Sequence, residues 1–342
     1  MSTKHHSPNK PSSWSGQQTT RLDHALIHRH HADEAFLADL ARTGPDTFTA
    51  VAVLPSAHPH YGGHTGPSRT MDPLLLLECA RQAETYAAHT LFGVEPDAHF
   101  VLRSWSTEFS PSPPGVRDCP TELRLTAQTR NPRTLGARLG RLEYDFELWA
   151  AGSRVGRVLM DVGYVSAAAY TVLRSRRRRG GAPPSSDTFV ALDGRPADPS
   201  TVGRTRPTDV VLLDVDSRGS LSTARLRVPT ENQSMFDHAQ DHVPAMVLME
   251  AARQFAALVV AEAGGPAPSR TRLVAIEATF DAYAELDDPV DLTAAAPVGS
   301  AAGWSVDVHF QQTGAQIAQA RIVMAVPEQT QEKETSWAGP QF

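Results

Sequence analysis

Residues 236–257, FDHAQDHVPAMVLMEAARQFAA, decide the fold of this chain. From Val243 onward the composition favours an α-helix of about fifteen residues or more. Because apolar residues leave no polar stripe on this helix, we predict that it is buried. Pro244 suits the first helical turn, where a missing N–H costs nothing, and Asp241 just upstream is expected to cap the free amides.

Three polar residues interrupt this apolar helix: Glu250, Arg253 and Gln254. They are spaced three and four positions apart, so they project from one face of the helix. One interpretation is a Glu–Arg pair that satisfies itself inside the core, although buried pairs stabilise little. The other is a small binding site, because an apolar wall with one carboxylate, one guanidinium and one amide is typical of such sites.

The same pattern occurs earlier in the chain. Residues 74–83, LLLLECARQA, align without gaps with residues 246–255, MVLMEAARQF. The matched polar residues are Glu78 with Glu250, Arg81 with Arg253, and Gln82 with Gln254. A weaker similarity joins residues 151–160 to residues 313–322. The repeat favours the binding site over the self-satisfied pair, and it predicts two copies of one domain.

The composition narrows the class of protein. The length of 342 residues fits two domains of ordinary size, and 41% hydrophobic content is enough for a core in each. The net charge of -6 implies neither a nucleic-acid partner nor an anionic membrane. Cys79 and Cys119 do not make a disulfide framework. Since no segment resembles a signal peptide or a membrane span, we predict a soluble, cytoplasmic protein.

The domain boundaries are predicted from composition. The polar N-terminus, residues 1–20, and the tail, residues 327–342, are expected to be disordered. The first repeat is placed at residues 21–166 and the second at residues 208–326. Between them, residues 167–207 are rich in Arg, Pro and Gly and are predicted to be a linker.

Two local patterns invite a functional interpretation. The linker contains Arg174 and an unbroken run from Arg176 to Arg179, which we interpret as a solvated basic segment or as a docking patch for an acidic protein or a phosphate. The start of the first repeat is rich in histidine, but only His24 and His28 have helical spacing and no second ligand cluster joins them. We therefore predict no metal and no cofactor.

Each repeat is expected to place one long helix among several antiparallel strands. Strands of the first repeat are predicted at residues 47–54, 100–109, 122–129, 142–149 and 154–165. Strands of the second repeat are predicted at residues 209–215, 221–229, 272–280, 290–295, 304–311 and 315–326. Because helices and strands do not alternate, the pattern indicates an α+β fold and not a parallel sheet.

These motifs resemble those of known protein families. A helix entered by a proline, with Glu six positions later and Gln four after that, is similar to the central helix of hotdog-fold enzymes. The segments FDHAQDHVPAMVLMEAARQ and DPLLLLECARQA, with AHPHY upstream, more closely resemble the A-factor biosynthesis (AfsA-like) hotdog family of actinobacteria. The resemblance covers the chain from about residue 28 to residue 326. It implies a double hotdog, in which two tandem repeats each wrap an antiparallel sheet around a central helix.

The resemblance also implies an activity, that of an acyltransferase in γ-butyrolactone, butenolide or furan autoregulator biosynthesis. Such enzymes move a β-ketoacyl group from acyl carrier protein to a hydroxyl of dihydroxyacetone phosphate. The family's important positions fall on Glu78, Glu250 and Arg253. A hotdog thioesterase or dehydratase and a non-enzymatic acyl-ligand sensor remain alternatives, because fold alone does not fix function. One chain already holds both hotdog copies, so we expect a monomer.

Acyl transfer to an alcohol needs a general base. We predict Glu250, with a pKa raised by apolar surroundings, for this role. The alternative base is His238 or His242, with its tautomer fixed by Asp237 or Asp241. Equally open is a purely structural role, in which the aspartates cap the helix and the histidines close a loop.

The remaining roles concern charge on the substrate. The first-turn amides of Ala245 and Met246 are expected to stabilise the thioester oxyanion. Arg253, with Arg81, is expected to bind the phosphate, or Arg253 only orients Glu250. Other predicted substrate contacts are Gln82, Gln254, Asp237 and Asp241. Since the first repeat lacks the Asp-His pairs, we expect one productive site at the interface of the repeats, built from both helices.

Overall fold

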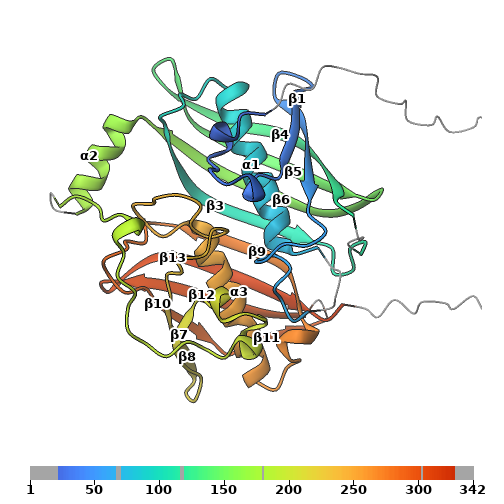
Figure 1. Cartoon of the computed structure of the whole chain (residues 1–342), viewed down its shortest axis with the longest axis vertical. Helices are drawn as coiled ribbons and strands as arrows, with labels where there is room; N and C mark the ends of the chain where they lie inside the picture. Colours follow the sequence, from blue (N-terminus) through green and yellow to red (C-terminus); the bar gives the residue numbers. More distant parts are fainter. Residues whose placement is uncertain (1–21, 67–70, 116–118, 179–180, 302, 328–342) are drawn as a thin grey trace, which may run out of the picture.

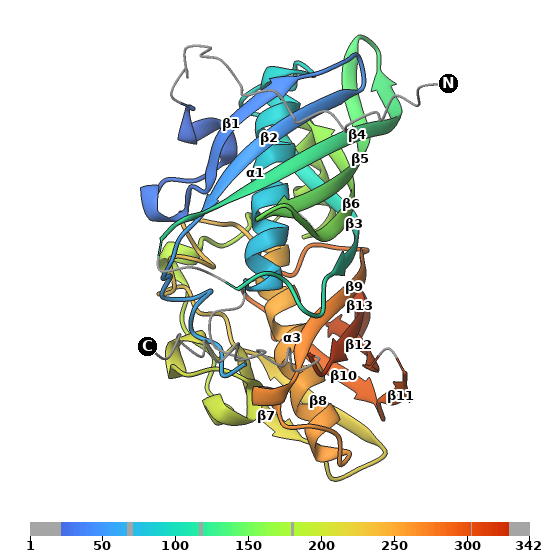
Figure 2. The same cartoon turned by 90° about the vertical axis from the view of Figure 1, so that its right-hand side faces the viewer.

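The computed structural model describes residues 22–66, 71–115, 119–178, 181–301 and 303–327. The expected disordered N-terminus, all but the first residue of the expected disordered tail, and Arg179 lie outside the described residues. In the described part, thirteen strands form one continuous antiparallel sheet that curves around two long helices (Figures 1 and 2). The predicted α+β double hotdog is confirmed.

The elements follow the same order in both halves. The first half contains β1 (Leu37–Arg42), β2 (Thr47–Leu54), α1 (Pro73–Thr90), β3 (His99–Phe109), β4 (Thr121–Leu135), β5 (Arg138–Ala150) and β6 (Ser153–Val165). The second half contains β7 (Leu212–Asp216), β8 (Leu221–Leu226), α3 (Ala245–Glu262), β9 (Arg272–Phe280), β10 (Asp291–Ala295), β11 (Val298–Ser300), β12 (Gly303–Gln312) and β13 (Ala315–Ala325). The strands predicted from sequence are confirmed, and β1 and β11 are additional.

Shorter elements complete the chain. Helix α2 (Ala167–Arg177) follows β6. The 3₁₀ helices are η1 (His24–Ile27), η2 (Ala32–Glu34), η3 (Ser186–Thr188), η4 (Pro199–Val202), η5 (Pro207–Asp209) and η6 (Pro268–Arg270). Two of these, η3 and η4, and helix α2 lie in the segment predicted to be a linker, and η5 begins at its last residue. That segment is therefore largely ordered, whereas its limits as a domain boundary stay a prediction.

The order of strands across the sheet shows the duplication. From one edge it runs β1-β2-β4-β5-β6-β3, and from the other edge it runs β7-β8-β10-β12-β13-β9. The halves meet where β3 pairs with β9, with Ser106 opposite Glu277. Each strand of the first half therefore has a counterpart in the second half, where β11 is an addition that pairs only with β12. This arrangement places α1 and α3 on the same side of the sheet, with their first turns near the junction (Figure 2).

The two long helices are buried because the sheet covers them. Helix α1 begins at Pro73, and the Asp72 side chain caps it by accepting a hydrogen bond from the Leu74 amide at 2.8 Å. Helix α3 begins at Ala245 after Pro244, without a side-chain cap. The predicted cap by Asp241 is wrong, because that carboxylate instead binds the Tyr170 hydroxyl of α2.

Helix α2 corrects the interpretation of the arginine run. Arg174 is only 1% exposed, and its guanidinium binds both carboxylate oxygens of Glu285 at 2.6 and 2.8 Å. Arg178 binds Glu285 and Asp287. A solvated basic segment is therefore wrong for these two arginines, because acidic residues more than 100 positions away neutralise them. Arg176 is exposed, and its docking role stays a prediction.

Candidate active site

The carboxylate of Glu250 is saturated by donors. Its Oε1 accepts hydrogen bonds from Arg204 Nε at 2.7 Å and Gln254 Nε2 at 2.5 Å, and its Oε2 accepts one from Arg253 Nη2. The residue is 1% exposed. Arg204, which comes from the segment predicted to be a linker, is equally buried. Each oxygen is therefore already occupied, and solvent does not reach the group.

The first repeat builds the same cluster around Glu78. Its carboxylate accepts hydrogen bonds from Arg29 at 2.6 Å, from Arg81 at 2.7 Å and from Gln82 at 2.8 Å. Arg29 thus corresponds to Arg204, and the other two donors correspond to the partners of Glu250. The two repeats therefore build equivalent ion clusters, and each includes an arginine, Arg29 or Arg204, that lies outside the duplicated motif.

The pKa of Glu250 is lowered, whereas the sequence predicted that it is raised. Burial by itself would raise the pKa, but the neighbouring Arg204 and Arg253 lower it below its usual value. The same balance lowers the pKa of Glu78 to about 2, with Arg29 and Arg81 as the cations. Glu250 therefore stays ionised and bound, and the predicted raised pKa is wrong. Arg253 lies on the same helix as Glu250, whereas the fold brings Arg204 from a segment 46 positions earlier in the chain.

The two motif glutamines bind backbone as well as their carboxylates. The Gln254 side chain donates to the Asp209 carbonyl at 2.7 Å and accepts from the Val211 amide at 3.0 Å. Gln82 makes the equivalent contacts with the Glu34 carbonyl and the Phe36 amide. Both side chains therefore fix the chain that enters the first strand of their repeat.

Arg253 joins the two central helices. Its Nη1 donates to both oxygens of Asp72, at 2.9 and 2.8 Å, while its Nη2 binds Glu250. Burial tends to raise the pKa of Asp72, but the Arg253 charge holds it well below its usual value. Since both ends of the guanidinium are engaged, this geometry fits the alternative in which Arg253 orients Glu250.

A cavity of about 640 Å³ lies between the two repeats. It is walled by α1, β3, α2 and the loop that leads into α3. The predicted site residues that line it are Arg81, Asp237, His238, Asp241, His242, Ala245 and Met246. Glu78, Glu250, Arg253, Gln82 and Gln254 are not among its lining residues. The loop residues and Arg81 therefore line the cavity, whereas the two carboxylates at the centres of the ion clusters do not.

The two Asp-His pairs differ in geometry. His242 Nδ1 lies 2.6 Å from Asp241 Oδ1, and no residue in the described ranges hydrogen-bonds its Nε2. His238 Nδ1 lies 3.4 Å from Asp237 Oδ2, and its Nε2 is 2.7 Å from the Gln240 amide nitrogen. From these contacts we assign the proton of His242 to Nδ1. Its Nε2 is then an acceptor at the cavity wall.

The carboxylates of these pairs are held ionised by different donors. Burial alone would raise the pKa of Asp241, but hydrogen bonds from His242 and Tyr170 lower it to about 2. Asp237 accepts the amides of His30 and His31, at 2.5 and 3.0 Å. Its pKa is also lowered despite burial, through these amides and His238. Asp237 therefore ties the first repeat to the loop and caps no long helix.

The first turn of α3 lies at the cavity wall. The Val247 amide bonds back to the Pro244 carbonyl at 2.9 Å. The amides of Ala245 and Met246 precede it, where a helix supplies no acceptor of its own. Both residues line the cavity, and this end of the helix carries the positive pole of its dipole. The arrangement can bind a developing negative charge.

One carboxyl at the cavity was missed from the sequence. Glu84, on α1, is 2% exposed and accepts hydrogen bonds from the hydroxyls of Tyr164 at 2.8 Å and Thr85 at 3.1 Å. Burial raises the pKa of Glu84 to about 7. Its position three residues after Arg81 places it on the same helical face, which is the one signal in the sequence that points to it.

The AHPHY segment links the repeats. His58 lies 3.4 Å from Glu34 of the first repeat, and His60 lies 3.1 Å from Asp209 of the second. Burial and the nearby Arg204 lower the pKa of His60 below its usual value. These histidines therefore contact equivalent acidic residues of the two halves, and neither lines the cavity.

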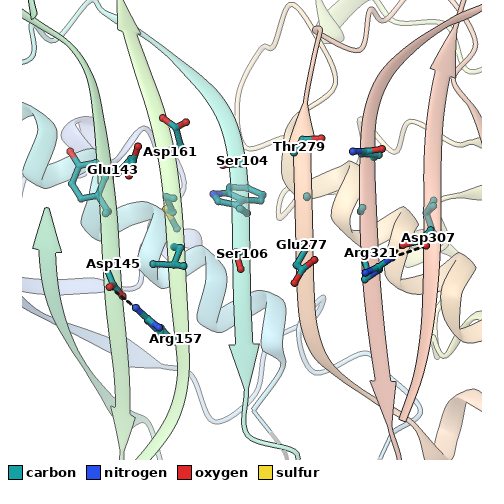
Figure 3. Close-up of a pocket in the computed structure, with 18 of the residues that line it drawn as sticks. Ser104, Ser106, Glu143, Asp145, Arg157, Asp161, Glu277, Thr279, Asp307 and Arg321 are labelled. Carbon is teal, nitrogen blue, oxygen red and sulfur yellow. Dashed lines mark hydrogen bonds and ion pairs between the residues drawn. The ribbon is translucent and has the colours of Figure 1, made fainter. Parts of the chain in front are cut away.

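A second hollow, of about 810 Å³, lies on the open face of the sheet. Figure 3 shows its side chains on the strands, with the helices behind the sheet. Its floor carries matching ion pairs, Asp145 with Arg157 at 2.7 Å and Asp307 with Arg321 at 2.8 Å. None of the residues predicted to form the site lines this hollow. The interface cavity is therefore the candidate active site.

Among the residues of the described ranges, no helix combines the length and the apolar character that a membrane span requires. In the same ranges, no group of three or more His, Cys, Asp or Glu side chains is arranged to hold a metal ion.

The duplicated sheet, the two buried helices and the cavity between them define a double-hotdog protein. The chain belongs to the A-factor biosynthesis hotdog domain family, whose model matches residues 13–166 and 186–326. It is 34% identical over 272 residues to a 2-oxo-3-(phosphooxy)propyl 3-oxoalkanoate synthase of Streptomyces virginiae, a match that covers 79% of this chain and 86% of the relative. The synthase of the same name from Streptomyces coelicolor is 33% identical over 279 residues, which covers 82% of this chain and 83% of the relative.

Solved structures show a more distant similarity. A putative oleoyl thioesterase from Lactobacillus plantarum superposes with a TM-score of 0.49 at 9% sequence identity. The match covers 83% of this chain and 98% of that structure.

Proposed function

We propose that this chain is an acyltransferase that moves a β-ketoacyl group from acyl carrier protein to the hydroxyl of dihydroxyacetone phosphate, in γ-butyrolactone-type or related autoregulator biosynthesis. Family membership supports this reaction, because the relatives are named for the phosphorylated ester that it forms. The observation that carries the proposal is the interface cavity, where an Asp-His pair, first-turn amides and an arginine face one space.

The proposed base is His242. Its Nε2 accepts the proton of the acceptor hydroxyl, while Asp241 holds the ring through Nδ1. The new C–O bond forms at the thioester carbon, and the C–S bond then breaks. The proton on His242 passes to the departing thiolate, so the histidine is restored. General base catalysis of this kind contributes roughly 10²–10⁴-fold to the rate.

The amides of Ala245 and Met246 are proposed to stabilise the intermediate. Negative charge collects on the thioester oxygen when the alcohol adds. Donors fixed by a helix stabilise such charge without reorganising during the reaction. The two residues thus keep the role expected from the sequence, because both line the cavity.

Arg81 is the proposed phosphate contact in place of Arg253. Its Nε and Nη2 bind Glu78, but its Nη1 donates to none of the described residues. The side chain is 21% exposed and lines the cavity. The pairing with Glu78 fixes the guanidinium, and the unused edge can take a phosphate oxygen.

The donor acyl chain is proposed to lie along the apolar wall of the cavity. This wall is formed by Phe100, Leu102, Trp105, Met160 and Val162. An acyl carrier protein as donor and a monomeric chain are parts of the same proposal. The monomer is supported by the single sheet, which joins both repeats within one chain.

The test is a discharge assay with a β-ketoacyl-carrier protein, with and without dihydroxyacetone phosphate, followed by mass spectrometry. We expect acceptor-dependent loss of the thioester and appearance of the phosphorylated ester. The variant His242→Gln is expected to lower kcat by about 100-fold or more. The matched variant His238→Gln is expected to lower kcat far less, because Gln240 already contacts Nε2 of the His238 ring.

The alternatives give different outcomes. Equal discharge without the acceptor would identify a thioesterase, and the phosphate role of Arg81 would be wrong. Absence of discharge would favour a sensor. Equal losses in the two histidine variants would contradict the choice of His242 as the base.

A further inference from the structure

Helix α2 packs on the loop that carries the Asp-His pair. The Tyr170 hydroxyl lies 2.9 and 2.8 Å from the two oxygens of the Asp241 carboxylate. The Arg174 Nη2 donates to the Asp241 backbone carbonyl at 2.9 Å, and its Nε lies 3.4 Å from the carboxylate. Both the side chain and the backbone of Asp241 are therefore held from α2.

Tyr170 is itself fixed by aromatic contacts. Its ring stacks on His99 of β3, with centroids 3.6 Å apart and planes 4° from parallel. The Tyr283 ring meets it edge-on at 5.7 Å. These contacts come from both repeats, so the hydroxyl is held in place without help from Asp241.

Arg174 is fixed by ion pairs on the second repeat. Its Nη1 and Nη2 reach the two oxygens of Glu285, and its guanidinium lies over the Tyr283 ring at 4.6 Å. Glu285 is placed by Gln312, whose side chain accepts the Glu285 amide at 2.9 Å. Since Arg174 is almost completely buried, this arrangement leaves it little freedom to move.

We infer that α2 positions the catalytic pair, with Tyr170 and Arg174 as positioning residues that act through Asp241 on His242. The inference rests on the proposed role of His242 as the base. A carboxylate orients a histidine only if its own position is fixed. The residues that hydrogen-bond to the carboxylate therefore commonly affect the activity of the histidine. Here the hydroxyl and the guanidinium supply those partners.

The second Asp-His pair lacks this support. Asp237 accepts backbone amides of the first repeat and makes no hydrogen bond with α2 within the described part of the chain. Its histidine lies at 3.4 Å, which is too long for a strong hydrogen bond. The contacts of α2 therefore distinguish the two pairs, and they select His242.

The test removes one hydroxyl. Tyr170→Phe keeps the stack on His99 but deletes both hydrogen bonds to Asp241. We expect kcat to fall about tenfold with KM unchanged, since the substrate contacts remain. The matched control is Thr171→Val, which deletes a hydroxyl from the next residue of α2, where it binds only the Ala167 carbonyl of the same helix. This control is expected to keep the wild-type kcat.

A second readout does not depend on catalysis. Nitrogen-15 NMR of histidine-labelled protein reports the tautomer of His242, and the variant His242→Asn identifies its signals. We expect a single Nδ1–H tautomer in the wild type and in Thr171→Val, and a mixture in Tyr170→Phe. If the wild type transfers no acyl group but the tautomer still changes, the proposed function fails and the positioning of His242 stands.

The inference would be overturned by a Tyr170→Phe variant with wild-type kcat. A wild-type tautomer in that variant would overturn it as well, whatever the activity. An equal fall of kcat in Thr171→Val would also overturn it, because a general loosening of α2 would then explain both results.

Discussion

The contacts of Glu250 support a structural role for this carboxylate. Its two oxygens bind Arg204, Arg253 and Gln254. Removal of its charge leaves the buried Arg204 without an anion, whereas Arg253 keeps its ion pair with Asp72. We therefore expect Glu250→Gln to lower the free energy of unfolding by about 3 kcal/mol or more, because breaking one side of a buried pair leaves an uncompensated charge. Denaturant unfolding measures this loss.

The control for Glu250 is an exposed pair. Glu122 binds Arg124 at 2.6 Å, but both side chains are more than half exposed. Glu122→Gln is expected to change the free energy of unfolding by less than about 1 kcal/mol. If Glu250→Gln instead loses activity while its stability matches that of the wild type, the structural role is wrong and the general-base prediction gains support.

Glu84 gives a stability prediction that depends on pH. Its pKa is about 7 in the folded protein, above the ordinary value of 4.5, so the folded state holds the proton more tightly. The fold therefore loses stability as the pH rises from about 4.5 through 7. Gln resembles the protonated acid, so Glu84→Gln is expected to match the wild type at pH 4.5. At pH 8 the variant is expected to be more stable by about 1–3 kcal/mol.

The measurement for Glu84 is denaturant unfolding of both proteins across this range of pH. The difference between variant and wild type is the relevant quantity, because carboxylates with lowered pKa values, such as Glu78, change stability only in stronger acid. A difference that does not vary with pH would contradict the raised pKa of Glu84.

Among the elements, α1 depends on Asp72 for two separate contacts. The carboxylate caps the helix and also binds Arg253 of α3. Asn is a good capping residue, so Asp72→Asn removes mainly the ion pair, whereas Asp72→Ala removes both contacts. We expect both variants to be destabilised, and Asp72→Ala to be the less stable by about 1 kcal/mol. Thermal and denaturant unfolding of the two variants test this difference, and equal stabilities would show that the cap contributes nothing.

The secondary structure of both repeats could be predicted because local signals determine it. The apolar runs of α1 and α3 and the β-branched residues of β2 and β9 indicate their own conformations. The prediction that Asp241 caps α3 was wrong, and helix α2 was not predicted. Both failures have the same cause. Tyr170 and Arg174 bind partners that lie about 70 and 110 positions away, and no local pattern reports such contacts.

The candidate site could be predicted only in part, for the same physical reason. The repeat and the loop before α3 identified Arg81, His242, Ala245 and Met246, which line the cavity. The direction of the Glu250 pKa shift depends on Arg204. This arginine is 46 positions from Glu250 in the chain, and strands β7 and β8 lie between them. Charge brought in by a distant segment therefore sets the direction of the Glu250 pKa shift, which the local sequence does not reveal.

At the scale of the whole molecule, pairing of β3 with β9 makes one sheet from two repeats. Each half alone would expose that strand edge and half of the cavity. We expect a chain cut between residues 182 and 183, which lie between α2 and η3, to remain associated and active when its halves are co-expressed. Either half alone is expected to be inactive. Size-exclusion chromatography and the discharge assay measure both properties, and activity in a single half would contradict a site shared by the repeats.

The ion pair between Asp72 and Arg253 has a consequence for the number of acyl groups that one chain binds. Arg253 is the counterpart of Arg81, yet the start of α1 engages its Nη1, the nitrogen that Arg81 leaves unused. Two equal sites in one chain would bind two acyl groups, one in each half. In the proposed mechanism the first half contributes the Arg81 guanidinium and the second half contributes His242, whereas Arg253, at the position equivalent to Arg81, binds Asp72. Binding of an unreactive acyl analogue should therefore saturate at one molecule per chain.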